Sequence, residues 1–445
     1  MARKVVVLGA GATGEAFAAA LRRHEPDAEI AVVEHELVGG ECSYWACIPS
    51  KTLLRPLEVV ERARLAPGAD AAVSAVDAER VFAWRDEVSE KDDSSQARWV
   101  TGTVGAELVR GTAVVAEPGL VRVGERDLPY DALMIATGSR PVVPRIEGLA
   151  EVPFWGSREG TSASAVPATL AIVGGGAVGC ELAQVYRRLG AEVTLVQNGA
   201  HLLPRLDPEA ADILADAFRE EGVELRFDAK ATRVEGGGDL PFRLELEGQE
   251  PVEAERLLVA TGRKPNVDGL GLEKLGLQIE RKGIVVDERL RAGEGVWAAG
   301  DVTGVALFTH VGKYQGRIAA GDVAGHDVRA DYRAIPAAIF TDPQVAATGD
   351  TSGEGAVTAS WKVESVARTG TFQKPKRPGL LKLYADPERR VLVGATAVGP
   401  EAGEWLGQLT LAIRAEVSVD VLRDTIQPFP TFSEAVHFAA RDLPL

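Results

Sequence analysis

Two stretches of the chain repeat one pattern of a β-rich run, a glycine turn and an amphipathic helix. The first reads KVVVLGAGATGEAFAAALRR and the second LAIVGGGAVGCELAQVYRRLG, so both carry the spacing G-x-G-x-x-G. The first glycine makes a tight turn, the second lets a pyrophosphate approach the backbone, and the third lets helix pack on strand. The helix N-terminus then presents free N–H groups to the phosphates. One such motif can be an ordinary turn, but two with correct flanks predict two dinucleotide sites.

The residues after each turn predict how the riboses are held. The glycines are Gly9, Gly11, Gly14 and, in the repeat, Gly174, Gly176, Gly179. Glu34 lies twenty residues after Gly14, where an acidic side chain holds ribose hydroxyls. The second strand of the repeat ends Val196, Gln197, Asn198. Because no carboxylate there repels a 2′-phosphate, we expect weak discrimination between nicotinamide dinucleotides, with a lean to NADPH over NADH.

Each repeat also ends alike, in a buried strand closed by Ala-Thr-Gly. These strands are YDALMIATGSRP (Tyr130–Pro141) and AERLLVATGRKPN (Ala254–Asn266). A related segment, GVWAAGDVTG, predicts a strand over 296–299 that ends at Gly300 and Asp301. Short alternating runs before the closures predict antiparallel meanders. They cover 112–116 and 121–123 in the first repeat, and 225–229 and 242–246 in the second.

After residue 329 the glycine-turn pattern stops. Strand-like runs over 337–340, 380–384 and 391–398 alternate with helical patterns over 401–415, 419–425 and 433–441. This mixture predicts a separate α+β unit.

Charge and cysteine content restrict the function further. The net charge of −16 over 445 residues argues against binding to nucleic acid or an anionic membrane. The N-terminus shows no targeting signal and no apolar run approaches the roughly 20 residues of a membrane span, so we expect a cytoplasmic protein. Two of the three cysteines, Cys42 and Cys47, lie five residues apart with no neighbouring histidine. Redox chemistry is therefore favoured, and no metal site is expected.

The segment GGECSYWACIPSK around these cysteines resembles the redox-disulfide motif of class I pyridine nucleotide-disulfide oxidoreductases. The resemblance extends through both glycine turns, both Ala-Thr-Gly closures, AAGDVTG and PTFSEA. It implies an α/β fold with two Rossmann-like dinucleotide-binding domains and a C-terminal α+β dimerisation domain. The FAD-binding domain with its central segment would cover 1–145 and 265–330, the NAD(P) domain 146–264, and the dimerisation domain 331–445. A homodimer sharing its active site across the interface follows from the same resemblance.

The resemblance also implies roles for individual residues. Cys42 would be the interchange thiol that attacks a substrate, and Cys47 the charge-transfer thiol beside FAD. Lys51 would lie near flavin N5, paired with Glu181, because a cation there stabilises reduced flavin. The expected cofactor contacts, besides Lys51 and the residues of the two glycine turns and their strands, are Gly40, Ala136, Thr137, Gly138, Gly262, Gly300, Asp301 and His310. Cys180 is expected to pack in the core.

Two departures from the family pattern affect the expected acceptor. Tyr44 and Trp45 stand between the cysteines, where the family has small or aliphatic residues, and either shape the site or pack against its wall. The C-terminal segment reads QPFPTFSEA, so Phe429 occupies the position of the family's proton-shuttling histidine, while Glu434 remains. His437 lies too far along the helix to replace it.

We therefore expect an FAD-dependent NAD(P)H oxidoreductase that passes electrons via FAD to the redox-active disulfide Cys42–Cys47 and on to a disulfide or a similar small acceptor with an easy leaving group. The alternatives are a quinone or oxygen reductase, a metal-ion reductase resembling mercuric reductase, and a non-catalytic subunit. An intact cysteine pair argues against the last. The metal-ion reductase is less favoured, because the segment ARDLPL lacks the C-terminal cysteines of that enzyme type.

Overall fold

The computed structural model describes residues 2–238 and 240–445, which form two compact units. The first unit contains the chain up to Ile48, Ser89–Val142 and Gly262–Asp331, and the second contains Pro49–Val88, Val143–Thr261 and Tyr332–Leu445. The segment 49–88 thus groups with the second unit, although it lies inside the range 1–145 expected for FAD binding. The division into three domains stays a prediction.

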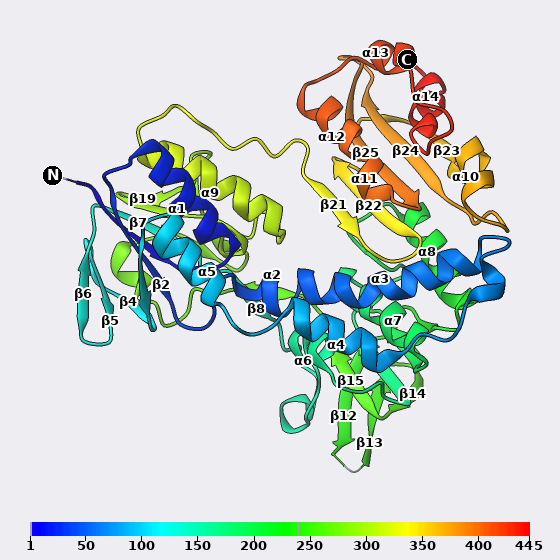
Figure 1. The fold of residues 1–445 in the computed structure, drawn as a ribbon, viewed down its shortest axis with the longest axis horizontal. Coiled ribbons are helices and arrows are strands. Elements are labelled where there is room, and N and C mark those ends of the chain that lie inside the picture. The colour runs from blue at the N-terminus through cyan, green and yellow to red at the C-terminus, as the bar shows by residue number, and fades with distance from the viewer. Residues whose placement is uncertain (1, 239) are drawn as a thin grey trace. The chain divides into compact units, whose positions relative to one another are not determined.

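The first unit is built around a sheet in the order β19-β20-β7-β1-β2-β3 (Figure 1). Its central strand β1 (Lys4–Leu8) is almost fully buried, as the unbroken apolar run Val5–Leu8 requires of a parallel strand covered on both faces. β1 pairs in parallel with β2 and β7. The other strands are β2 (Glu29–Glu34), β3 (Glu107–Arg110), β7 (Ala132–Ile135), β19 (Arg291–Gly293) and β20 (Val296–Ala298).

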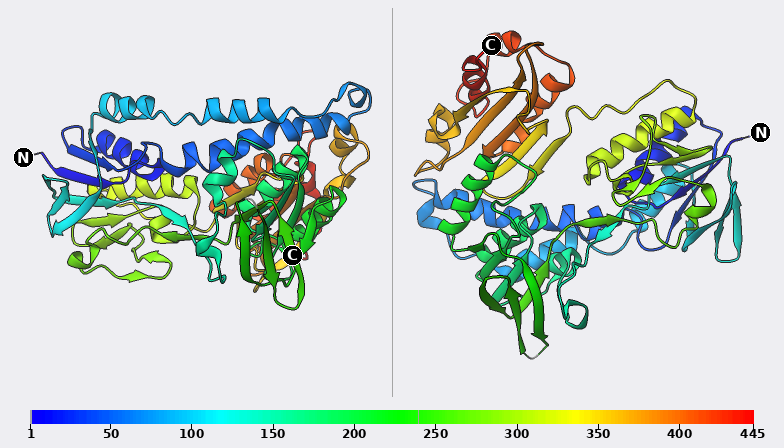
Figure 2. Two further views of the ribbon diagram at one scale, coloured as in Figure 1. Left: turned by 90° about the horizontal axis from the view of Figure 1, so that it is seen from below. Right: turned by 180° about the vertical axis from the view of Figure 1, so that it is seen from behind.

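Helices α1 (Ala12–His24) and α9 (Thr309–Val323) pack closely against each other in this unit (Figures 1 and 2). Glycines make the close approach possible. A Cβ atom on Gly312 would lie 2.2 Å from the Thr13 hydroxyl, and one on Gly316 would lie 2.8 Å from the Thr13 carbonyl oxygen. The antiparallel meander expected next is confirmed as β4 (Ala113–Glu117), β5 (Leu120–Val123) and β6 (Arg126–Pro129).

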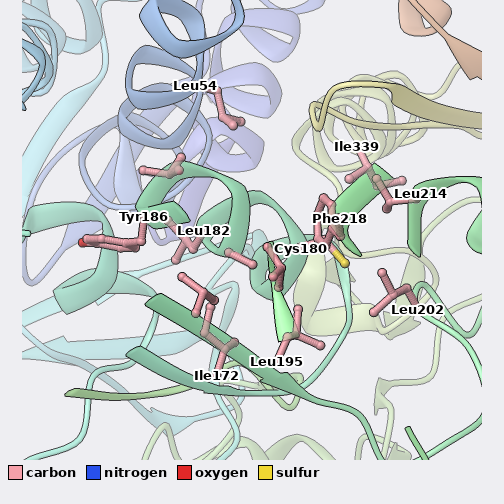
Figure 3. Close-up of a cluster of buried hydrophobic side chains, with 14 of the residues drawn as sticks. Leu54, Ile172, Cys180, Leu182, Tyr186, Leu195, Leu202, Leu214, Phe218 and Ile339 are labelled. Carbon is pink, nitrogen blue, oxygen red and sulfur yellow. The ribbon is translucent and has the colours of Figure 1, made fainter. Parts of the chain in front are cut away.

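The second unit repeats the glycine-turn fold in a sheet of order β11-β10-β9-β15. β9 (Thr169–Val173) leads through the turn into α7 (Ala177–Leu189) and then β10 (Glu192–Val196). The sheet closes with β15 (Arg256–Val259), and α8 (Pro208–Glu220) leads to the opposite edge at β11. Cys180 lies wholly inside the core of this unit with Leu182, Leu202 and Phe218, which confirms its expected packing role (Figure 3).

One predicted element of this repeat is wrong. Residues 225–229 were expected to open a meander, but Leu225 belongs to β11 (Glu224–Arg226), which pairs in parallel with β10. The strand ends because Asp228 adopts a φ of 49°, which extended pairing does not tolerate. The meander itself consists of β12 (Ala231–Gly237), β13 (Leu240–Leu246) and β14 (Gln249–Ala254).

The C-terminal part of the second unit is an antiparallel sheet, β21-β22-β25-β24-β23, covered by helices. Three of its strands were predicted: β21 (Pro336–Ile339), β24 (Leu380–Asp386) and β25 (Val391–Gly399). β22 (Gln344–Gly349) and β23 (Val357–Lys362) were not, and the helix expected over 401–415 is two helices, α11 (Ala402–Trp405) and α12 (Gly407–Arg414). Gly407 at the break has the low helix propensity of its residue type. α13 (Val419–Asp424) and α14 (Glu434–Arg441) follow as expected.

Among the residues that the structure describes, no helix is both long and apolar enough to cross a membrane.

Candidate functional site: two dinucleotide turns and a cysteine pair

In the first glycine turn, the packing of the protein itself requires glycine at two positions and not at the third. A Cβ on Gly9 would lie 2.5 Å from the Ala136 carbonyl oxygen, and one on Gly14 would lie 2.0 Å from that of Gly9. A Cβ on Gly11 would meet nothing closer than 3.9 Å. The protein's own packing therefore leaves free space at Gly11, at the N-terminus of α1. The turn fits a dinucleotide pyrophosphate, which would fill that space.

The second turn repeats this arrangement. A Cβ on Gly174 would lie 2.5 Å from the Ala260 carbonyl oxygen, and one on Gly179 would lie 1.9 Å from that of Gly174. Around Gly176, at the N-terminus of α7, a Cβ would meet nothing within 4 Å. Both turns can therefore accept a pyrophosphate, one in each unit.

The side chains that follow the two turns occupy equivalent positions. Glu34 ends β2 and accepts a 2.8 Å hydrogen bond at Oε2 from the Ala10 N–H. Gln197 directly follows β10 and accepts a 2.8 Å hydrogen bond at Oε1 from the Gly175 N–H. Both side chains are buried. Asn198, by contrast, is exposed.

The strands that follow the two Ala-Thr-Gly closures pair within the first unit. The strand after the first, β8 (Ser139–Pro141), pairs with the strand after the second, β16 (Arg263–Pro265). Thr137 Oγ1 donates to the Asn266 carbonyl oxygen over 2.7 Å, and Gly138 and Gly262 adopt φ values of 70° and 124°. The sequence order alone does not reveal this pairing, because 121 residues (142–262) separate the two strands.

Asp301 lies in a polar network next to these closures. Its Oδ2 accepts a 2.6 Å hydrogen bond from Ser139 Oγ, and Arg263 Nε donates to the same hydroxyl over 2.8 Å. The preceding Gly300 donates its N–H to Gln315 on α9 over 2.6 Å. Asp301 is thus held by the Ser139 hydroxyl, which Arg263 holds in turn, and the carboxylate keeps further acceptor capacity.

The cysteine segment begins directly on the first glycine turn. Gly39 donates its N–H to the Ala10 carbonyl oxygen over 2.8 Å, and a Cβ on Gly40 would lie 3.0 Å from the Gly11 Cα. Cys42 then lies in α2 (Gly40–Tyr44), and Cys47 begins α3 (Cys47–Arg64). The two cysteines therefore lie on separate helices, which Trp45 and Ala46 separate.

Both cysteines are free thiols, and they are linked by a hydrogen bond. That bond and burial raise the pKa of Cys42 well above its usual range, while Thr309 and Lys313 lower it. The Cys47 Sγ lies 3.4 Å from Thr309 Oγ1, at the N-terminus of α9. Sequence analysis missed Thr309 and chose the next residue, His310, which is exposed and stacks on Phe308. Only the tertiary packing of α9 distinguishes the two.

The two aromatic residues between the cysteines are part of the wall. Tyr44 and Trp45 are both buried and contact each other edge to face, with centroids 5.6 Å apart. The Tyr44 hydroxyl donates to the Val38 carbonyl oxygen over 2.9 Å. Of the two readings that the sequence left open, the structure therefore favours packing over direct lining of the site.

In the second unit, Lys51 and Glu181 form the ion pair that the resemblance implied. Lys51 Nζ lies 2.7 Å from Glu181 Oε2 and 4.9 Å from the centroid of the Phe340 ring. Glu181 also accepts a 3.0 Å hydrogen bond from the Phe340 N–H and is only 4% exposed. A charge buried this far is stable only with such partners, and they fix the position of the ammonium group.

The C-terminal segment presents its aromatic ring outward. Phe429 is 75% exposed, whereas the Glu434 side chain at the start of α14 has a buried Oε2 with no hydrogen-bond partner among the described residues. The Nδ1 atom of His437 lies 3.1 Å from the Arg423 carbonyl oxygen.

Comparison with known families agrees with this arrangement. The pattern described as "Pyridine nucleotide-disulphide oxidoreductase" matches residues 3–327, and that described as its dimerisation domain matches residues 335–440. The chain belongs to the pyridine nucleotide-disulphide oxidoreductase family. It is accordingly an FAD-dependent oxidoreductase that uses a pyridine nucleotide, with two Rossmann-like domains and a C-terminal dimerisation domain.

Its relatives include more than one kind of enzyme. The chain is 34% identical to mercuric reductase from Acidithiobacillus ferrooxidans, over 98% of this chain and 82% of that protein. It is also 34% identical to dihydrolipoyl dehydrogenase from Thermus scotoductus, over 99% of this chain and 97% of that protein. LpdA from Mycobacterium tuberculosis has a TM-score of 0.87 and 27% identity over 99% of both chains. The flavoprotein disulfide reductase RclA from Escherichia coli, 24% identical with a TM-score of 0.87, shows the fold alone.

Proposed function

We propose that the enzyme passes two electrons from NADPH to the disulfide of Cys42 and Cys47, and from the resulting thiols to a disulfide whose leaving thiol has a low pKa. The overall reaction is NADPH, a proton and RSSR giving NADP⁺ and two RSH. Bound FAD supplies the two-electron relay between nicotinamide and disulfide. The observation that carries the proposal is Cys42 and Cys47 in contact at the first glycine turn, with Thr309 at the second sulfur.

The thiol chemistry requires two successive exchanges. The Cys42 thiolate attacks one acceptor sulfur, forming a mixed disulfide and releasing the first thiolate. The Cys47 thiolate then attacks Cys42, re-forming the internal disulfide and releasing the second. The N-terminus of α9 beside Cys47 favours negative charge on that sulfur. Lys51, fixed by Glu181, would add positive charge at the flavin, and Asp301 and Glu34 would hold the ribityl chain and the adenosine ribose.

The nature of the acceptor follows from the C-terminal segment. General acid assistance is typically worth about 10²–10⁴-fold in rate, and phenylalanine at position 429 cannot provide it. Glu434 Oε2 is buried and has no hydrogen-bond partner among the described residues, so it does not replace the histidine by itself. A thiol of low pKa leaves as thiolate without a proton. We therefore infer that aromatic or otherwise activated disulfides react well and aliphatic ones poorly, in a homodimer whose second subunit places this segment at the site.

Nicotinamide preference follows from the second glycine turn. Gln197 keeps the hydrogen bond to the turn without a negative charge, so a 2′-phosphate is not repelled. Arg226 pairs in register with Val196, directly before Gln197, but its guanidinium already forms a 2.5 Å ion pair with Glu224. The lean to NADPH therefore rests on the absence of a carboxylate at Gln197.

Metal-ion reduction is the second candidate, supported by the identity to mercuric reductase. Thiolates are soft ligands that select soft metals. The same cysteine pair could therefore pass two electrons to Hg²⁺. Measuring NADPH oxidation with Hg²⁺ and with an aromatic disulfide in parallel separates the two candidates.

The decisive test of the acceptor compares an aromatic disulfide with lipoamide in the wild type and in Phe429→His. We expect brisk wild-type turnover of the aromatic disulfide, slow turnover of lipoamide, and an increase of about tenfold or more for lipoamide alone in the variant. Ile426→His is the matched control, because it adds a histidine to the same exposed segment. Brisk wild-type turnover of lipoamide, unchanged by Phe429→His, would sink the proposal.

A further inference from the structure

A lysine lies on the face of α9 that meets the cysteine pair. Thr309, at the start of α9, contacts Cys47 Sγ at 3.4 Å. Lys313 is four residues further along this helix, so it lies on the same face, one turn on. The positive charge of Lys313 acts on Cys42 and lowers the pKa of its thiol, opposing the effects of the Cys47 hydrogen bond and burial. The lysine is itself solvent-exposed.

A carboxyl group approaches the same lysine from the neighbouring helix. α1 and α9 touch where Thr13 meets Gly312, the residue before Lys313. Glu15, two residues after Thr13, interacts electrostatically with Lys313. Burial raises the pKa of Glu15 to about 7, and Lys313 partly opposes this effect. Glu15 therefore changes charge near neutral pH.

The other charged groups around this cluster belong to α2 and the segments beside it. The charges of Glu15, Asp92, Asp93 and Arg110 all act on the Tyr44 hydroxyl. The pKa of Tyr44 is raised to about 12 by burial and by the charges of Asp93, Glu15 and Asp92. The phenol therefore stays neutral between pH 6 and 9. Lys313 is a cation whose charge acts on the Cys42 thiol.

We propose that Lys313 is a positioning residue whose positive charge stabilises the Cys42 thiolate from within the same chain. Glu15, when it is ionised, weakens this stabilisation by compensating the charge of Lys313. This deepens the proposed function and rests on Cys42 being the interchange thiol. Phe429 cannot act as a base that deprotonates the Cys42 thiol. A nearby cation can instead shift the equilibrium between thiol and thiolate toward the thiolate, without taking up a proton itself. When Glu15 is protonated, the charge of Lys313 is uncompensated and its effect on Cys42 is largest.

The test is the rate at which Cys42 is alkylated by iodoacetamide in the reduced, FAD-loaded enzyme, measured between pH 6 and 9. The thiolate forms the S–C bond and iodide leaves, so the rate reports thiolate content. Peptide mapping identifies which cysteine reacts. We expect Lys313→Met to slow alkylation at pH 7 about two- to fivefold, the range for an exposed charge pair. Lys313→Arg should restore the rate. Glu15→Gln should leave the lysine uncompensated and speed alkylation by a smaller factor.

Two controls separate electrostatics from packing. Arg317→Met removes an exposed cation one turn further along α9 and should leave the rate unchanged. Salt at 1 M should abolish the difference between wild type and Lys313→Met, because it screens exposed charges beyond about 3 Å. If Lys313→Met does not fold, Lys313→Gln serves the same purpose.

The inference is overturned if the Lys313 variants react like wild type, or if Lys313→Met and Glu15→Gln change the rate in the same direction. Equal slowing by Arg317→Met would also overturn it. If mapping shows that Cys47 rather than Cys42 is alkylated, the role assignment in the proposed function fails instead.

Discussion

The two glycine turns have the same backbone arrangement, but the side chain that closes them is charged in the first and neutral in the second. Leu8 pairs with Val33 in the first module and Val173 with Val196 in the second, so Glu34 and Gln197 occupy the same structural position. Each accepts a 2.8 Å hydrogen bond from the N–H after the first glycine. Both turns therefore need a side-chain oxygen that accepts this hydrogen bond, and an amide oxygen serves as well as a carboxylate oxygen. The negative charge is a separate feature, and only the first module carries it.

The residues that follow the third glycine differ for a similar reason. Glu15 occupies this position in the first module and Cys180 in the second. Cys180 is wholly buried and its Sγ lies 3.4 Å from the Gly175 carbonyl oxygen, so it serves packing alone. Glu15 instead meets a lysine of α9, the helix that contacts Cys47. The same position thus packs in the core in one module and carries a carboxyl group that interacts with Lys313 in the other.

The largest expected effect comes from closing the free space in each turn. Gly11 and Gly176 have φ values of −73° and −78°, which any residue adopts, so alanine there leaves the fold intact. Each lost hydrogen bond to a charged phosphate costs about tenfold in affinity or more. Gly11→Ala should release FAD, measured by the flavin absorbance that remains after gel filtration. Gly176→Ala should keep the flavin and raise KM for NADPH. If both variants lose the same cofactor, the two turns do not divide the cofactors as proposed.

A smaller effect is expected from restoring the missing charge. Gln197→Glu keeps the hydrogen-bonding oxygen and adds a carboxylate that repels a 2′-phosphate. The ratio of kcat/KM for NADPH to that for NADH should fall about tenfold, or about 1.4 kcal/mol. Asn198→Asp, which adds the same charge at the exposed neighbouring residue, should change the ratio less. A wild-type preference for NADH beyond about tenfold would contradict the comparison itself.

The sequence was most informative where local chemistry decides structure. Glycine spacing placed Gly9–Gly14 and Gly174–Gly179 correctly because a turn between strand and helix is a local requirement. The sequence does not predict contacts that depend on tertiary packing, because no sequence pattern links Thr309 to Cys47 or Lys313 to Glu15. The edge strand around Leu225 was misassigned for the same reason. Its alternation fits either kind of sheet, and only its neighbour β10 decides between them.

The central claim is that electrons pass through Cys42 and Cys47 in distinct roles, and flavin absorbance tests it most directly. Partial reduction of the wild type should produce a long-wavelength band from charge transfer between the Cys47 thiolate and FAD. Cys47→Ser should abolish this band, whereas Cys42→Ser should show it without any reductant, because the freed Cys47 thiolate persists. Identical spectra for the two variants would contradict the account.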